Sequence, residues 1–256
     1  MEIENLSYNE NKNKFKNNPL LPKSIRGVII GKSGCGKTCL MLNLLLKDWL
    51  DYDNLKIFGK SLFQPEYKIV KKGFEESLPK ESIYKLFQCL DEFENLDPYK
   101  LMEQVGKKIN ILNPIKCCFY DNGKDVPDPS ELDSKNKNLM IFDDLLLEKQ
   151  NKCEDYYVRG RHSNVNCFYL AQNYFKLPRQ TIRENSNFLI LFRQDYKNIN
   201  HIYNDHVSTD MDIDEFRNLC KQCWSKPYGF VCIDLTSSPM NGKYRYKLDT
   251  FYIPKK

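Results

Sequence analysis

Residues 31–38 read Gly-Lys-Ser-Gly-Cys-Gly-Lys-Thr and match the G-x-x-x-x-G-K-[ST] pattern of a phosphate-binding loop. The pattern lies between an apolar run, residues 25–30, and a helical run, residues 38–50. A strand that leads through a glycine-rich turn into a helix points several backbone N–H groups at one place, where the helix dipole also favours an anion. This context predicts a triphosphate site.

Individual loop residues have predicted contacts. Lys37 is expected to reach the β- and γ-phosphates, and the Thr38 hydroxyl is expected to hold Mg²⁺. The glycines let the backbone bend closely around the ligand. The predicted nucleotide contacts come from the loop and the residue after it: Gly31, Lys32, Ser33, Gly34, Cys35, Gly36, Lys37, Thr38 and Cys39.

Composition favours one globular domain. The chain has 256 residues, of which 41% are hydrophobic, so it can bury one sizeable core. It contains no apolar run long enough for a membrane span and no signal-peptide core, and we expect a soluble, unsecreted protein. The ten cysteines lack a disulfide framework, and Cys220 and Cys223 lack a second pair at zinc spacing. A net charge of +5 is compatible with a nucleic-acid partner but does not by itself argue for one.

The order of apolar and polar segments predicts an α/β fold with a mainly parallel central sheet flanked by helices. We expect a polar tail over residues 1–22, a P-loop domain over 23–235, and a C-terminal extension over 236–256 whose alternating pattern fits an edge strand. A helical region over 66–108, interrupted at Pro79 and at 97–98, precedes a long connection over 113–138. Predicted strands cover residues 25–30, 55–58, 139–142, 166–171, 187–192 and 228–235.

Two carboxylates, Asp143 and Asp144, follow the apolar run 139–142. A strand that ends in this way has the form of a Walker B element. Asp143 would hold Mg²⁺ through its water shell, and Asp144 would polarise the attacking water. Paired acids at a strand end also occur as plain helix caps, and the phosphate loop about a hundred residues upstream favours the first interpretation.

Two further features lie downstream. Arg159 and Arg161 flank a glycine, and a planar, permanently charged guanidinium suits the charge that develops on a transferred phosphoryl group. A surface salt bridge or a contact with a phosphate backbone is the alternative role for these arginines. Gln172 ends the apolar run 166–171 and offers both a donor and an acceptor for sensing the γ-phosphate or orienting water.

With these motifs assembled, the chain resembles the poxvirus-type genome-packaging ATPases, a branch of the FtsK–HerA superfamily that is also found in virophages, giant viruses and Polinton-like elements. The resemblance covers roughly residues 31–192. It rests on GKSGCGKT at 31–38, SLFQPEY at 61–67, IFDDLLLE at 141–148, YYVRGRHSNVNCFYLAQNYFKLP at 156–178 and TIRENSNFLILF at 181–192.

The resemblance implies a RecA-like core that hydrolyses ATP with Mg²⁺, a homo-oligomeric ring (a pentamer or a hexamer), and transport of double-stranded DNA, largely independent of its sequence, into a preformed capsid. It also implies capsid vertex or portal components as partners, and a viral replication site in the host cell or the virion as the location. By position, Lys37 and Thr38 resemble Walker A and Asp143 the Mg²⁺-ligating acid.

The same resemblance makes Asp144 the catalytic neighbour, although many relatives carry Glu there, and Gln172 the sensor. It makes Arg159 or Arg161 an arginine finger that acts on the nucleotide of a neighbouring subunit. Two other functions fit the motifs. A small-molecule or nucleoside kinase would need an arginine-rich lid, which residues 183–187 do not resemble. A nucleotide-binding assembly protein would need no turnover, and the N-K-x-D motif of ordinary GTPase switches is absent.

Overall fold

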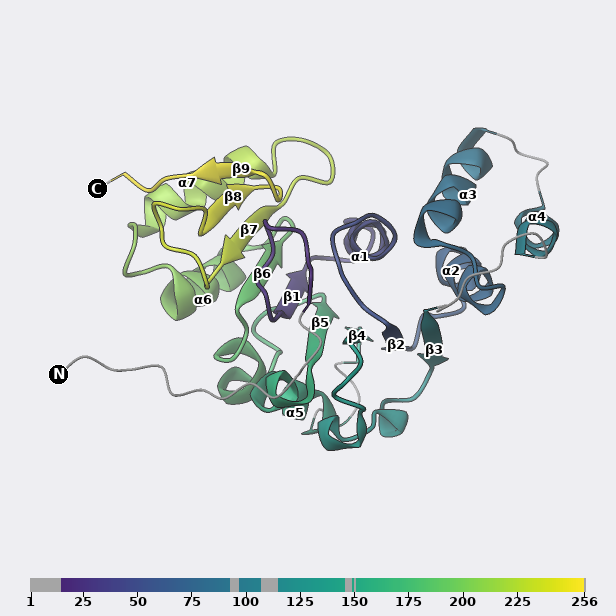
Figure 1. Cartoon of the computed structure of the whole chain (residues 1–256). Coiled ribbons are helices and arrows are strands. Elements are labelled where there is room, and N and C mark those ends of the chain that lie inside the picture. The colour runs from purple at the N-terminus through teal and green to yellow at the C-terminus, as the bar shows by residue number, and fades with distance from the viewer. Residues whose placement is uncertain (1–14, 93–96, 107–114, 146–148, 150, 256) are drawn as a thin grey trace.

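The computed structural model describes residues 15–92, 97–106, 115–145, 149 and 151–255. Within these residues the strands form one sheet in the order β3-β2-β4-β5-β1-β6-β7-β8-β9 (Figure 1). The strands are β1 (Arg26–Ile30), β2 (Asn54–Gly59), β3 (Lys116–Tyr120), β4 (Asn138–Asp143), β5 (Val165–Ala171), β6 (Phe188–Leu191), β7 (Val231–Asp234), β8 (Tyr244–Tyr246) and β9 (Thr250–Tyr252). The neighbours from β3 to β6 pair in parallel, which confirms the predicted mainly parallel sheet.

The central strands are apolar because helices cover both faces of the sheet. All residues of β4 and β5 are buried. Successive side chains of β1 alternate between two cores: Ile29 packs with α1–α4, and Val28 and Ile30 pack with α5–α7. The helices are α1 (Lys37–Leu46), α2 (Pro65–Glu75), α3 (Lys80–Glu92), α4 (Pro98–Gly106), α5 (Asn151–Val158), α6 (Tyr196–His206) and α7 (Ile213–Cys223).

Local signals explain most helix boundaries. The predicted breaks at Pro79 and at residues 97–98 are confirmed, because α3 begins directly after Pro79 and α4 begins at Pro98. The Asp195 carboxylate caps α6 by accepting from the Asn198 amide at 2.8 Å, and Asp212 caps α7 in the same way. The helix expected over residues 38–50 is shorter, since α1 ends at Leu46.

The interpretation of residues 113–138 as one long connection is wrong for its first part. β3 occupies Lys116–Tyr120 and pairs in parallel with β2. Its residues are half-buried or exposed, so the segment lacks a long apolar run. The Tyr120 ring stacks on Phe58 with centroids 4.8 Å apart, which anchors this edge strand to the sheet.

The last strands run antiparallel to their neighbours, so β7, β8 and β9 continue the sheet beyond β6. Arg245 of β8 is buried and forms an ion pair with Asp234 of β7 at 2.8 Å. Its guanidinium also donates to the carbonyl of Leu20, which fastens the chain before β1 to the far end of the fold. The strands β8 and β9 lie within the expected C-terminal extension, residues 236–256.

Several compositional expectations can be compared with the structure. All ten cysteines are free thiols, and both members of the C-x-x-C pair, Cys220 and Cys223, are buried in α7. Across the described parts of the chain, no helix combines the length and apolar character that crossing a bilayer requires. Most of the expected polar tail, residues 1–14, lies outside the described residues.

Candidate nucleotide-binding site

The candidate residues meet at the carboxyl edge of three adjacent strands. β5 lies between β1 and β4. The strand register pairs Ile30 with Ala171 and Asp143 with Leu170. The residues that follow these pairs therefore leave the sheet side by side, and α/β sheets bind ligands at this edge.

Close packing fixes the start of the phosphate loop. The Gly31 amide donates to the Ala171 carbonyl at 3.0 Å, so the loop continues the β1–β5 pairing by one bond. A Cβ on Gly31 would lie 2.3 Å from the Cys35 sulfur, and therefore only glycine fits there. Gly36 has a φ of +102°, a conformation that other residues rarely adopt.

The loop ends at a helix terminus that is open to an anion. Gly36 is the N-cap residue of α1 and provides no side-chain hydrogen bond, and the first turn contains no acidic residue. Helix N-termini carry N–H groups without intrahelical partners together with a positive partial charge. The buried Lys37 ammonium donates to the carbonyls of Gly31 at 2.7 Å and of Lys32 at 3.1 Å. Phosphate oxygens can replace these two carbonyls as acceptors.

Asp143 ends β4 as a buried carboxylate, with 8% of its surface exposed. Burial raises its pKa above the ordinary value, while a hydrogen bond from Tyr67 and the charge of Lys37 oppose the rise. The Tyr67 phenol donates to Asp143 Oδ2 at 2.6 Å. Burial and the Asp143 charge raise the pKa of Tyr67 far above its ordinary value, so the phenol remains a proton donor.

Tyr67 is a site residue that the sequence interpretation missed. It belongs to α2, 76 positions before Asp143, and it is fully buried. The stretch SLFQPEY, which contributed to the family resemblance, ends in this residue. Since Pro65 starts α2 and Tyr67 follows two residues later, the stretch sets both the beginning of the helix and the contact with Asp143.

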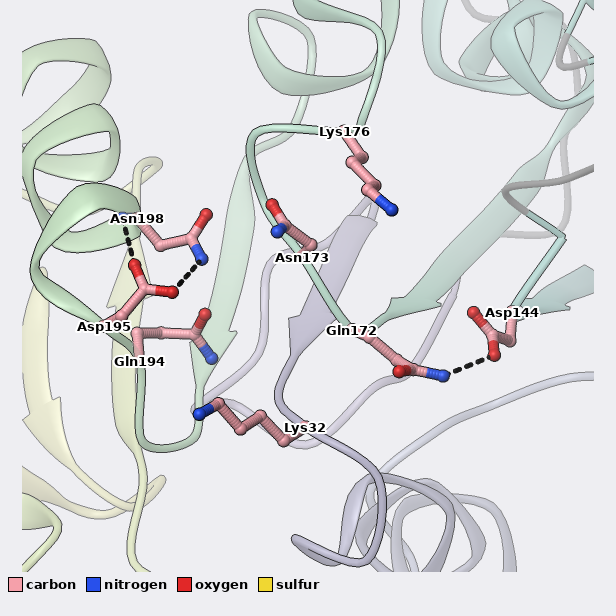
Figure 2. A pocket seen from close by; sticks show the side chains of 8 residues that line it. All are labelled: Lys32, Asp144, Gln172, Asn173, Lys176, Gln194, Asp195 and Asn198. Atoms are coloured by element: carbon pink, nitrogen blue, oxygen red, sulfur yellow. Dashed lines mark hydrogen bonds between the residues drawn. The ribbon is translucent and has the colours of Figure 1, made fainter.

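Asp144 and Gln172 form a direct pair across the mouth of the site. Gln172 Nε2 donates to Asp144 Oδ2 at 2.7 Å (Figure 2). The Asp144 backbone has a φ of +54°, and its amide donates to the Leu170 carbonyl at 3.0 Å. A non-glycine residue in this left-handed region carries strain, and such strain concentrates at functional sites. The structure therefore brings together two of the predicted catalytic residues.

A pocket of about 400 Å³ opens beside this pair. Figure 2 shows Asp144 and Gln172 on one wall, and Gln194, Asp195 and Asn198 on the opposite wall. Lys32 of the phosphate loop also lines the pocket, so the space joins the loop to the Asp144–Gln172 pair. All of its lining residues are polar or charged, which suits a phosphate group and water better than an apolar ligand.

Comparisons with known proteins support the fold. No family model matches the sequence, and no curated protein matches it. Solved structures of genome-packaging NTPase B204 from Sulfolobus turreted icosahedral virus 2 are similar. The sulfate complex has a TM-score of 0.52 at 11% identity and covers 91% of this chain and 99% of B204.

Two nucleotide-analogue complexes of B204 agree with this result. The AMPPCP complex has a TM-score of 0.50 at 9% identity and covers 84% of this chain and 95% of B204. The ATP-γ-S complex has a TM-score of 0.50 at 11% identity and covers 82% of this chain and 92% of B204. The chain has the fold of a P-loop NTPase. At these identities the similarity concerns the fold alone, which confirms the predicted α/β class.

Arg159 lies away from its own phosphate loop. It follows α5 and precedes η3, the 3₁₀ turn Gly160–Ser163 that leads into the start of β5. β5 has seven residues and spans roughly 20 Å at about 3.3 Å per residue, so the turn that begins after this arginine lies at the opposite end of the strand from the carboxyl edge. Its guanidinium pairs with Asp155 at 2.9 Å and with Asp128 at 3.3 Å. Arg161 lies within η3.

The R-E-N-S-N stretch, residues 183–187, also lies at the amino end of the strands and holds β1 in place. The Asn187 side chain accepts from the Arg26 amide at 2.8 Å and donates to the Ser24 carbonyl at 2.7 Å. The Asn185 carbonyl accepts from Arg26 Nε at 2.7 Å. Arg183 forms a buried ion pair with Asp205 at 3.0 Å. These contacts give the stretch a structural role.

Proposed function

We propose that the protein is an ATP-driven motor that moves viral double-stranded DNA into a preformed capsid. The observation that carries this proposal is the meeting of the phosphate loop, the buried Asp143 and the Asp144–Gln172 pair at one sheet edge. Similarity of the fold to a genome-packaging NTPase supports it. A homo-oligomeric ring and sequence-independent DNA contacts belong to the same proposal.

The oxygen donors near the loop fit Mg²⁺. Asp143 supplies a carboxylate and Thr38 a hydroxyl, and Mg²⁺ in nucleotide sites is typically bound by one or two carboxylates together with substrate phosphates. The described residues contain no cluster of three or more His, Cys, Asp or Glu side chains that could hold a metal by itself, which agrees with this mode of binding. Bound Mg²⁺ would neutralise charge on the β- and γ-phosphates.

The chain's own groups then have distinct roles. Lys37 moves its ammonium from the loop carbonyls to the phosphate oxygens, where it stabilises negative charge. Asp144 orients the attacking water and accepts its proton. Gln172 holds the Asp144 carboxylate through its amide nitrogen, which leaves its amide oxygen available to the same water.

Tyr67→Phe is expected to raise the Mg²⁺ concentration needed for half-maximal ATP hydrolysis by about 10- to 100-fold, as is typical when a group that orients a metal ligand is removed. In the wild type, the hydrogen bond from Tyr67 lowers the pKa of Asp143. Without the phenol this pKa therefore rises further. The protonated fraction of Asp143, which cannot hold Mg²⁺, then grows as pH falls. The increase in the Mg²⁺ requirement should therefore be larger at pH 6 than at pH 8. Mg²⁺ titrations of the hydrolysis rate at both values measure this.

Tyr156→Phe is the matched control for Tyr67→Phe. It removes a buried tyrosine hydroxyl that donates to the Pro127 carbonyl at 2.8 Å, on the other face of the sheet. Its Mg²⁺ dependence should equal that of the wild type. A Tyr67→Phe protein with the same Mg²⁺ requirement as Tyr156→Phe would show that Tyr67 does not position the metal ligand.

ATPase assays with and without double-stranded DNA test the proposed function. We expect hydrolysis to be stimulated by duplex DNA of any sequence, and the stimulation to fall steeply with salt, because a motor must contact the phosphate backbone of every part of a genome. Phosphoryl transfer to a small acceptor would favour a kinase. Nucleotide binding without turnover would favour an assembly protein. Stimulation that requires one duplex sequence and persists at high salt would contradict the motor.

A further inference from the structure

An aromatic ring that the phosphate-binding chemistry does not use lies against the phosphate loop. Tyr228 belongs to the connection between α7 and β7 and is 71% exposed, the largest exposed fraction among the large hydrophobic side chains of the described residues. A Cβ built on Gly36 would lie 3.0 Å from Tyr228 Cδ1 and 3.7 Å from Cε1. One edge of the ring is therefore in contact distance of the loop, and most of the ring faces solvent.

The backbone holds this ring at an energetic cost. Residues 226–229 form a turn closed by a hydrogen bond from the Gly229 amide to the Lys226 carbonyl at 3.1 Å. Pro227 and Tyr228 are its central residues, and Tyr228 has a φ of +56°. A turn with proline first and a positive φ second is of type II, and glycine or asparagine is usual at that second position. A tyrosine there carries strain without burying its ring.

The surroundings fix the turn on both sides. A Cβ on Gly229 would lie 1.9 Å from the Cys223 carbonyl oxygen, so the chain packs directly on the end of α7. Trp224 Nε1 donates to the Leu191 carbonyl at 2.8 Å, which ties the same segment to β6. The Phe230 ring contacts Phe192, beside the loop, with centroids 5.5 Å apart. The tyrosine is thus presented to the loop by a rigid support.

We propose that the Tyr228 ring is the platform on which the base of the bound nucleotide stacks, an inference that rests on the proposed ATP-binding function. A triphosphate seated on the loop and the first turn of α1 directs its γ-phosphate to the pocket of Asp144 and Gln172. Tyr228 is not among the residues that line that pocket. The ring lies beside Gly36, the N-cap of α1, and outside that pocket, a position that suits the ribose and base of the ligand rather than its γ-phosphate.

An exposed ring fits a base because both are flat and apolar on their faces, and stacking requires no reading of the base edge. Among the described residues, the Tyr228 ring has no aromatic partner and its hydroxyl has no hydrogen-bond partner, so its outer face is available. Stacking on it removes exposed apolar surface from both groups. The free energy gained by this stacking would offset the backbone strain of a tyrosine at a turn position that prefers glycine.

Calorimetric titration with ATP and with inorganic tripolyphosphate, each with Mg²⁺, tests the proposal on the full chain. Tyr228→Gly removes the ring and supplies the residue that the turn prefers, so the fold should be retained. We expect ATP affinity to fall by about 5- to 150-fold, the range for loss of one base–aromatic stack, and tripolyphosphate affinity to stay at the wild-type value. Tyr228→Phe should bind both ligands as the wild type does. Tyr99→Ala, which removes an exposed tyrosine of α4, is the matched control.

Three results would overturn the proposal. ATP affinity that is unchanged in Tyr228→Gly would show that the base does not contact the ring. Equal losses for ATP and tripolyphosphate would show that the ring acts through the shape of the loop. Wild-type protein that binds neither ligand would reject both the platform and the proposed function. Wild-type protein that binds ATP with the predicted Tyr228 dependence, but never hydrolyses it, would reject the motor and support the platform.

Discussion

ATP hydrolysis by the Asp144→Asn protein is expected to be about 10²- to 10⁴-fold slower than that of the wild type, with little change in nucleotide affinity. Asparagine keeps the size of the side chain and an oxygen that can accept the Gln172 hydrogen bond, so the arrangement at the mouth of the site should persist. It removes the negative carboxylate that we propose takes the proton of the attacking water. Single-turnover hydrolysis, together with equilibrium binding of an ATP analogue, separates the chemical step from binding.

Asp195→Asn is the control for the Asp144 experiment. Asp195 lines the same pocket from the opposite wall, and its function in the fold is to cap α6. Asparagine caps helices about as well as aspartate does, so hydrolysis should change by no more than a few-fold. Wild-type hydrolysis by Asp144→Asn, or equal losses in the two variants, would contradict the role proposed for Asp144.

Replacing both Arg159 and Arg161 by alanine is expected to reduce ATP turnover by about 10³- to 10⁵-fold, the factor in kcat that an arginine finger usually contributes. Arg159 lies near the start of β5 and its own phosphate loop lies near the other end of this strand, which spans roughly 20 Å, so we propose that the arginine acts on the nucleotide of another subunit. Its ion pairs with Asp155 and Asp128 are exposed and screened by solvent, so their loss should not unfold the chain.

Mixing two inactive proteins tests whether the arginines act between subunits. The Lys37→Ala protein keeps its arginines, and the double arginine variant keeps its phosphate loop. Mixed assemblies should recover part of the activity, because some interfaces then combine a working arginine with a working loop. Arg179→Ala, which removes an exposed arginine that pairs with Glu184, should retain full activity without mixing. Failure to recover activity, despite demonstrated co-assembly, would leave these arginines without a catalytic role between subunits.

The sequence predicts the central part of the fold because the signals there are local. Residues 139–142 and 166–171 are mainly apolar runs that are followed by polar side chains, and β4 and β5 place those ends at one edge. The phosphate-loop motif likewise predicts its own turn and the helix that follows it. β3 escaped prediction because an edge strand with half-buried residues has no such run, and turn-forming residues surround it.

The contacts that complete the site depend on the tertiary fold. Tyr67 reaches Asp143 only because α2 packs against the sheet beside β3, where the tyrosine ring also lies against Phe119, a relation that no spacing in the sequence reveals. Tyr228 reaches Gly36 across 192 positions of chain, through a turn whose strain is visible only in the backbone angles. A tyrosine after a proline could have suggested an unusual turn, but it could not have indicated that the ring lies beside Gly36.

Displacement of a third strand from a DNA triplex is the most direct measurement of the motor. A protein that moves along duplex DNA strips a triplex-forming oligonucleotide from its path, whereas one that only binds DNA or hydrolyses ATP does not. We predict that the wild-type protein displaces the oligonucleotide when ATP and Mg²⁺ are present, and that the Lys37→Ala protein does not. ATP hydrolysis stimulated by duplex DNA, with the triplex left intact by assembled wild-type protein, would contradict the account.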